Sequence, residues 1–190
     1  GKLSAAKAEL EQLGSCQVKT WALNSSDEPK VKEFCAQLRD RSIDHLVTTP
    51  GGSARLGNLV ANKRDCDGVR KQFDLKFFAQ LCPVLAMSDK LKDHGSITMT
   101  SGILSRRTGR GNDALAISNA AIETLTRCLA NDHGFDGRKI RVNCLSPGMT
   151  LTGVYGTSEW AKFYQEKAAK SVPLQRNGLP REAAHAITFL

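Results

Sequence analysis

The sequence has little of several features that commonly reveal a function. Aromatic residues make up only 6% of it, and its six cysteines include no C-x-x-C pair. Its four histidines lie far apart, without the spacing of metal ligands, so no metal site is predicted. No apolar run approaches the roughly 20 residues that cross a bilayer. We therefore expect a soluble intracellular protein in a reducing compartment, cytoplasmic by default with an organelle left open, and without a membrane span.

The formal net charge of +8 limits the class of partner only in part. Such an excess suits nucleic acid, an acidic partner or an anionic small molecule such as a phosphorylated cofactor. The basic residues are spread along predicted helix faces, as at Lys30, Lys32 and Arg39, and aromatic side chains for base stacking are scarce. Nucleic-acid binding is therefore disfavoured, and the charge does not choose between the other two.

What the sequence does contain is a regular alternation of helix and strand patterns. Its 190 residues, 41% of them hydrophobic, suffice for one buried core. The periodicity predicts helices at residues 2–13, 28–40, 65–91 (kinked at Pro83), 113–133, 158–171 and from 180 onward, and strands at 18–23, 44–47, 96–100 and 139–144. This alternation is typical of an α/β fold, a Rossmann-like doubly wound parallel sheet, in a single domain spanning residues 1–190.

The pattern departs from a complete fold of this kind at both ends. Such a fold begins with a buried strand and a glycine-rich turn that binds a pyrophosphate at a helix N-terminus. The sequence opens directly in the predicted helix at residues 2–13 and stops inside another. We therefore expect a fold in which the first β-α unit and the last strand are missing from the chain.

Four segments in fixed order resemble the short-chain dehydrogenase/reductase family and together cover nearly the whole chain. The segment D-H-L-V-T-T-P-G resembles the family's D-x-L-V-N-N-A-G, and G-S-I-T-M-T-S resembles G-S-I-V-N-x-S. I-R-V-N-C-L-S-P-G resembles I-R-V-N-x-V-S-P-G, and the last segment resembles P-x-x-R-x-G-x-P-x-E-x-A. They stand at residues 44–51, 95–101, 140–148 and 173–190.

The resemblance implies catalysis by a Tyr, a Lys four residues later, a Ser and an Asn. In this sequence Leu115 stands at the tyrosine, Asn119 at the lysine, Gly102 at the serine and Lys76 at the asparagine. Tyr and Lys at i and i+4 share one helix face, so losing both removes the usual acid and base. The chain thus looks like an atypical branch of the family that lacks the Y-x-x-x-K motif.

Three residues are candidates for the missing catalytic groups. Ser101 takes the serine position if the alignment slips by one residue, and Lys76 is a compensating cation in the place vacated by the family lysine. The alternative for Lys76 is that it reaches solvent or pairs with Asp74 or another carboxylate. Tyr155 lies in the region that forms the substrate lid in the family, residues 149–178, and either reaches the substrate or packs its ring there.

The cofactor side of the family pattern is better preserved. The resemblance implies NADP or NAD as cofactor, and Lys2, near the position that distinguishes the two, favours NADP. The basic loop at residues 105–112 follows the strand that carries Ser101 and is either an anion site or a solvated loop. The residues predicted to bind the dinucleotide are Asn24, Thr49, Pro50, Gly51, Thr100, Asn119, Pro147, Gly148, Thr150 and Thr152.

Two functions follow from these patterns. The first is an atypical oxidoreductase that transfers hydride between a nicotinamide cofactor and a small carbonyl or alcohol. The second is a catalytically inactive family member, a pseudoenzyme that serves as a binding or structural subunit of a larger complex, which Leu115 favours. The resemblance also implies a homo-oligomer formed through the helices near residues 65–91 and 113–133.

Overall fold

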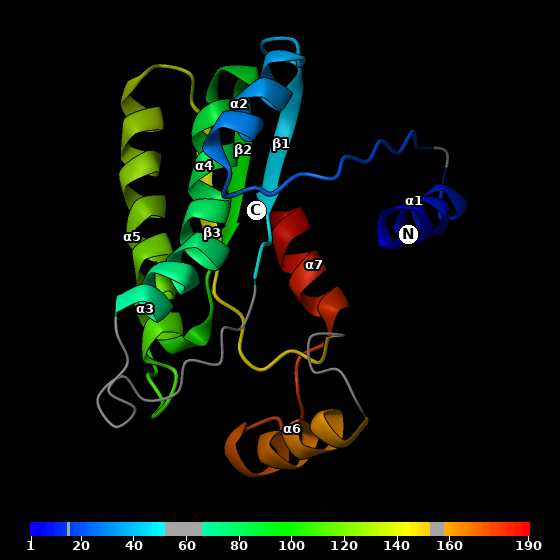
Figure 1. Cartoon of the computed structure of the whole chain (residues 1–190), viewed down its shortest axis with the longest axis vertical. Helices are drawn as coiled ribbons and strands as arrows, with labels where there is room; N and C mark the ends of the chain where they lie inside the picture. Colours follow the sequence, from blue (N-terminus) through cyan, green and yellow to red (C-terminus); the bar gives the residue numbers. More distant parts are fainter. Residues whose placement is uncertain (15, 52–65, 153–157) are drawn as a thin grey trace.

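The computed structural model describes residues 1–14, 16–51, 66–152 and 158–190. Three strands form one sheet in the order β1 (Ile43–Thr48), β2 (Leu91–Thr100), β3 (Arg141–Leu145), and both pairs are parallel (Figure 1). Leu46 lies opposite Ile97, which in turn lies opposite Val142. The predicted α/β fold with a parallel sheet is confirmed.

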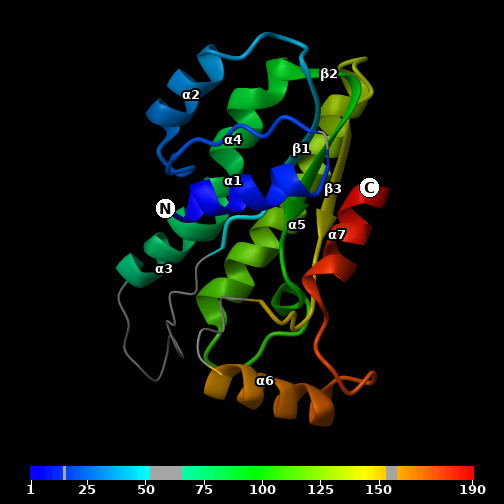
Figure 2. The same ribbon diagram turned by 90° about the vertical axis from the view of Figure 1, so that its right-hand side faces the viewer.

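Helices cover both faces of this sheet, as a doubly wound fold requires. One face carries α4 (Ala79–Met87) and α5 (Asp113–Phe135), and the other carries α7 (Pro180–Phe189) (Figure 2). The helix α2 (Glu28–Ala36) packs against α4 from outside. Farther from the sheet lie α1 (Lys2–Gln12) and α6 (Ser158–Ser171). No helix in the described parts of the chain is both long and apolar enough to cross a membrane.

The core is built around the central strand β2. Its residues Ser96 to Met99 are all buried, as expected for a strand with a neighbour on each edge and helices on both faces. A smaller apolar cluster of Val31, Cys35 and Cys82 joins α2 to α4. The main core consists of Val84, Leu91, Ile97, Met99, Ile122, Leu129, Ile140 and Val142.

The prediction of a strand at residues 18–23 was wrong, because the segment forms no strand. The described residues form only three strands, none of which pairs with this segment. The segment instead packs through its side chains: the centre of the Trp21 ring lies 5.1 Å from the centre of the Phe34 ring of α2.

The long helix predicted at residues 65–91 is divided in the structure. It consists of α3 (Cys66–Phe73), a π-helical turn η1 (Asp74–Phe78) and α4, and Leu91 already belongs to β2. The interruption lies in the π turn upstream of Pro83, which sits inside α4. Such turns are frequent at functional sites because they change which side chains face inward. Here Lys76 of η1 is buried.

The other boundaries differ from the predicted ones by a few residues. The second helix ends at Ala36 rather than at residue 40, and α5 extends to Phe135. The strand β2 begins at Leu91, five residues before its predicted start. Short 3-10 turns, η2 (Ser88–Lys90) and η3 (Ile103–Ser105), flank this strand.

Candidate active site

The candidate site lies at the carboxyl edge of the sheet, where open parallel sheets bind their ligands. The strands end at Thr48, Thr100 and Leu145, and all point toward the same end of the molecule (Figure 1). The segments that follow them contain most of the residues predicted to bind a cofactor. The parallel sheet therefore brings these separate stretches of sequence to one edge.

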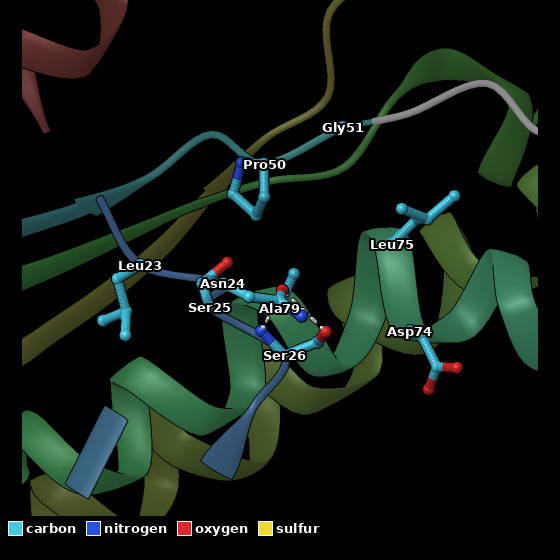
Figure 3. Close-up of a pocket in the computed structure, with 9 residues that line it drawn as sticks. All are labelled: Leu23, Asn24, Ser25, Ser26, Pro50, Gly51, Asp74, Leu75 and Ala79. Atoms are coloured by element: carbon cyan, nitrogen blue, oxygen red, sulfur yellow. Dashed lines mark hydrogen bonds between the residues drawn. The ribbon is translucent and has the colours of Figure 1, made fainter. Parts of the chain in front are cut away.

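A cavity of about 300 Å³ lies between the segment after residue 22, the loop after β1 and the π turn. Asn24, Pro50 and Gly51, all predicted cofactor residues, line it (Figure 3). The Asn24 amide oxygen accepts hydrogen bonds from the Ser26 backbone nitrogen at 3.2 Å and the Ser26 hydroxyl at 2.9 Å. That oxygen is thus already engaged in the turn before α2. The other lining residues are Leu23, Ser25, Ser26, Asp74, Leu75 and Ala79.

Lys76 is buried beside this cavity, with only 7% of its surface exposed. Its Nζ donates to the Pro50 carbonyl at 3.4 Å, and a Cβ at Gly51 would lie 3.9 Å from the same atom. Burial disfavours the ammonium and lowers the pKa of Lys76 from 10.5 to about 8. The side chain therefore does not reach solvent, and among the described residues it forms no ion pair with Asp74.

Asn119 and Gly102, which the sequence patterns assigned to the lysine and serine positions of the resembling family, fit one another closely. Asn119 is 2% exposed, and a Cβ at Gly102 would lie only 2.9 Å from its Nδ2. The φ of Gly102 is 176°, an extended conformation open to any residue. A side chain at position 102 would therefore crowd the Asn119 amide, whereas the backbone conformation there would accept any residue.

We expect Gly102→Ala to destabilise the protein by about 1–3 kcal/mol, because the added methyl group must displace a buried amide. Asn119→Ala removes that amide, so the cost of Gly102→Ala should largely disappear in the double variant. Denaturant unfolding of the four proteins measures this coupling. Gly148→Ala is the matched control, since a Cβ there meets nothing within 4 Å. If Gly102→Ala costs as much stability in the Asn119→Ala background as in the unchanged protein, the close contact between the two residues is contradicted.

Two buried oxygen atoms near the strand ends have no hydrogen-bond partner among the described residues. They are Asn119 Oδ1 and Thr100 Oγ1. Buried polar atoms are nearly always paired, so unpaired ones indicate a place for a ligand or water. A carbonyl oxygen accepts, and a hydroxyl both donates and accepts, so hydroxyl groups of a ligand suit both.

Ser101 is buried and its hydroxyl faces α5. Its Oγ donates to the Asn119 carbonyl at 3.0 Å and lies 3.4 Å from Oε1 of Glu123. Sequence reasoning missed Glu123, although its position four residues after Asn119, within a largely apolar stretch, marks the same helix face. Its carboxylate also binds side chains from the loops that follow β2 and β3.

Gln80 is the second functional residue that the sequence patterns missed. It is fully buried and uses all four of its hydrogen-bonding positions. Its Oε1 accepts from Thr48 Oγ1 at 2.8 Å and from the Thr100 nitrogen at 2.9 Å. Its Nε2 donates to the carbonyls of Thr100 at 2.9 Å and Lys76 at 3.2 Å. A glutamine within the run A-Q-L-C-P-V-L was the available signal.

The remaining residues predicted to bind the cofactor do not line this cavity. Thr49 is exposed after β1. Pro147, Gly148, Thr150 and Thr152 follow β3 and do not line the cavity of Figure 3.

The loop after β3 is tied to two other segments. The Ile103 nitrogen donates to the Pro147 carbonyl at 2.9 Å. Thr150 forms a bridge with Gly178, which brings the two ends of the predicted lid together.

Other residues were singled out from the sequence, namely Tyr155, Leu115 and the arginines of the basic loop. Tyr155 lies outside the described residues. Leu115 is half-buried in the first turn of α5, without a polar group to offer. In the basic loop Arg106 bonds Glu123, whereas Arg107 and Arg110 are exposed. Within the described ranges no group of three or more metal-ligating side chains gathers.

Comparison with known proteins places the chain in a family. A family model described as enoyl-(acyl carrier protein) reductase matches residues 2–190. The chain belongs to the short-chain dehydrogenase/reductase family. An uncharacterized oxidoreductase of Bacillus subtilis, YxbG, is 30% identical over 182 residues, which are 92% of this chain and 66% of that protein. The 3-oxoacyl-[acyl-carrier-protein] reductase FabG of Thermotoga maritima is 27% identical over 176 residues, 92% of this chain and 70% of FabG.

Solved structures share the fold of this chain. A small-chain dehydrogenase in complex with NADPH is 32% identical with a TM-score of 0.79, covering 88% of this chain and 74% of that one. L-Sorbose reductase from Gluconobacter frateurii, complexed with NADPH and L-sorbose, has a TM-score of 0.86 at 19% identity, covering 99% and 75%, and shows the fold alone. The chain thus spans about two thirds of YxbG and about three quarters of these structures.

Proposed function

We propose that this chain is the core of an NADP(H)- or NAD(H)-dependent oxidoreductase that acts on a small carbonyl or alcohol with a replaced catalytic set. The observation that carries the proposal is the buried Lys76, whose Nζ has the Pro50 carbonyl as its partner beside the cavity. Burying an ammonium is costly, and strongly perturbed groups in clefts are candidates for function. The NADPH bound by a relative 32% identical supports the choice of cofactor.

The residues present fit a dinucleotide in two respects. Gly51 leaves the wall of the cavity free of a side chain, which allows close approach of a ligand. Asn119 Oδ1 and Thr100 Oγ1 offer buried oxygens to hydroxyl donors such as those of a ribose. The nicotinamide would supply or accept the hydride. We assign the carboxamide side to Pro147, Gly148, Thr150 and Thr152, and favour NADP because of Lys2.

Lys76 supplies the acid and base in this proposal. With a pKa of about 8, its ammonium is the main form at neutral pH and gives up its proton readily. In the reductive direction it donates a proton to the oxygen that gains charge as hydride arrives at the carbonyl carbon. In the oxidative direction the neutral amine takes the proton from the alcohol. Ser101 keeps a supporting part through its bond to the Asn119 carbonyl.

Binding of NADPH, followed by its intrinsic fluorescence, tests the cofactor proposal. We expect Gly51→Val to weaken binding at least about tenfold, because its side chain fills part of the cavity. Gly14→Val is the control, since Gly14 lies outside the cavity in open space. Equal affinities of the two variants, or no dinucleotide binding by the unchanged chain, would contradict the proposal.

A pseudoenzyme is the second candidate, favoured by the apolar Leu115 where the family has its acid. Exposed Leu85 on α4 and Ile117 on α5, 57% and 48% exposed, also support an oligomer or a larger assembly through these helices. NADPH oxidation with a panel of small aldehydes and ketones separates the two functions. Nucleotide binding without any turnover would favour the pseudoenzyme.

A further inference from the structure

Glu123 is the centre of a hydrogen-bonded cluster that the proposed chemistry does not use. Its Oε1 accepts from Ser105 Oγ and Ser146 Oγ, each at 2.6 Å, and lies 3.4 Å from Ser101 Oγ. Its Oε2 accepts from Arg106 Nε at 3.2 Å. One carboxylate of α5 therefore binds side chains from both loops at the carboxyl edge of the sheet.

The hydrogen bonds from the serines stabilise this cluster more than the ion pair with Arg106 does. The Glu123 side chain is 11% exposed, but that of Arg106 is 70% exposed, and exposed ion pairs contribute little. Short bonds from hydroxyls to an ionised carboxylate are among the stronger hydrogen bonds in proteins. Burial acts to raise the pKa of Glu123, but the bonds from Ser105, Ser146 and Arg106 outweigh it and lower the pKa below 4.5. The group is therefore charged throughout the neutral range.

The cluster joins two loops whose backbones also touch. The Ser101 nitrogen donates to the Leu145 carbonyl and the Ile103 nitrogen to the Pro147 carbonyl, each at 2.9 Å. Ser146 immediately precedes Pro147. The bond from Ser146 to Glu123 therefore fixes the start of the loop that carries Pro147 and Gly148.

We infer that Glu123 is a positioning residue: through Ser146 it holds the Pro147–Gly148 segment in the place where it receives the nicotinamide. This inference rests on the proposed dinucleotide binding. Glu123 does not touch the cofactor itself, and acts through the geometry of the loop. We expect the sheet and α5 to remain folded without it, because the apolar core that includes Ile122, Leu129 and Val142 packs them together.

Hydrogen exchange in the ligand-free chain tests the inference without any cofactor. We expect Glu123→Ala to speed exchange of the Ile103 amide about tenfold or more, because its bond to Pro147 loses support, while core amides of β2 stay protected. Ser146→Ala should reproduce most of this effect. Ser105→Ala removes an equally short bond, but from the turn that carries Ile103 itself, and it leaves the Ser146 bond to the Pro147 loop in place, so its effect should be smaller. Thr124→Ala, at an exposed position of the same helix, is the surface control.

Nucleotide affinity gives the second measurement. Glu123→Ala and Ser146→Ala should each weaken NADPH binding about tenfold, with Glu123→Gln intermediate because it retains one acceptor oxygen. Uniformly faster exchange in all variants, or equal effects of Ser105→Ala and Ser146→Ala, would overturn the positioning role. If the unchanged chain binds no dinucleotide, the proposed function fails, yet the exchange of Ile103 still decides whether Glu123 holds the loop.

Discussion

Replacing Lys76 by methionine is expected to make the protein more stable at neutral pH. The pKa of Lys76 is lowered from 10.5 to about 8, so between these values the unfolded chain holds a proton that the folded protein lacks. Folding at pH 7 therefore buries a charge at a cost of about 3 kcal/mol. Methionine is of similar length and carries no charge, so Lys76→Met removes this cost.

The pH dependence identifies the cause of this gain. The stability of the unchanged protein should rise as the pH increases from about 8 to 10.5, because the unfolded state binds more protons over that window. Lys76→Met lacks this rise, so its advantage should be largest below pH 8 and vanish above 10.5. Urea unfolding at pH 7 and 10.5 measures both. Lys19→Met, at an exposed lysine, should change neither value. A loss of stability in Lys76→Met at pH 7 would refute the account.

The same substitution is expected to lower the turnover rate about 10²–10⁴-fold if Lys76 is the acid and base. In the unchanged protein, carbonyl reduction should decline above a pH of about 8, because the ammonium is lost, and alcohol oxidation should increase there. Rates of NADPH oxidation and NADP reduction against pH test this directly. Turnover that survives in Lys76→Met with an unchanged pH profile would remove Lys76 from the mechanism.

The sequence patterns predicted those parts of the site that depend on strand ends. Pro50 and Gly51 line the cavity because they follow β1 at the carboxyl edge of the sheet, and Asn24 joins them although the segment before it forms no strand. Lys76 is buried, so of the two readings of this lysine the one in which it reaches solvent is wrong. Such features follow from local periodicity and the rules of parallel sheets.

Features that depend on distant partners were not predictable in this way. A π turn at Asp74–Phe78 reflects how the helix packs and not its composition, so the sequence indicated one long helix. The strand predicted at residues 18–23 did not form, because a β-strand needs a neighbouring strand to which its backbone can hydrogen-bond. Glu123 acquires its role from serines on two separate loops, which no spacing in its own helix reveals.

Gln80→Leu is expected to cost about 3–5 kcal/mol of stability, among the largest effects of a single side chain here. The substitution removes the partners of the Thr48 hydroxyl and of the Thr100 nitrogen and carbonyl, all held by Gln80 across the ends of β1 and β2. Leucine has a similar volume, so the loss comes from unpaired polar groups and not from a cavity. Urea unfolding measures it, with exposed Gln37→Leu as the control, expected to change stability by less than about 0.5 kcal/mol.

The position of Gln80 also connects this stability to the site. Thr48 is followed two residues later by Pro50, whose carbonyl accepts the bond from Lys76, and the backbone of Lys76 itself accepts from Gln80 Nε2. Gln80→Leu should therefore weaken NADPH binding as well as folding, even under conditions where the protein remains folded. Gln80→Glu separates the two causes, because it keeps the acceptors for Thr48 and Thr100 but loses both donors. If this variant binds NADPH normally, the donors to Thr100 and Lys76 contribute to folding alone.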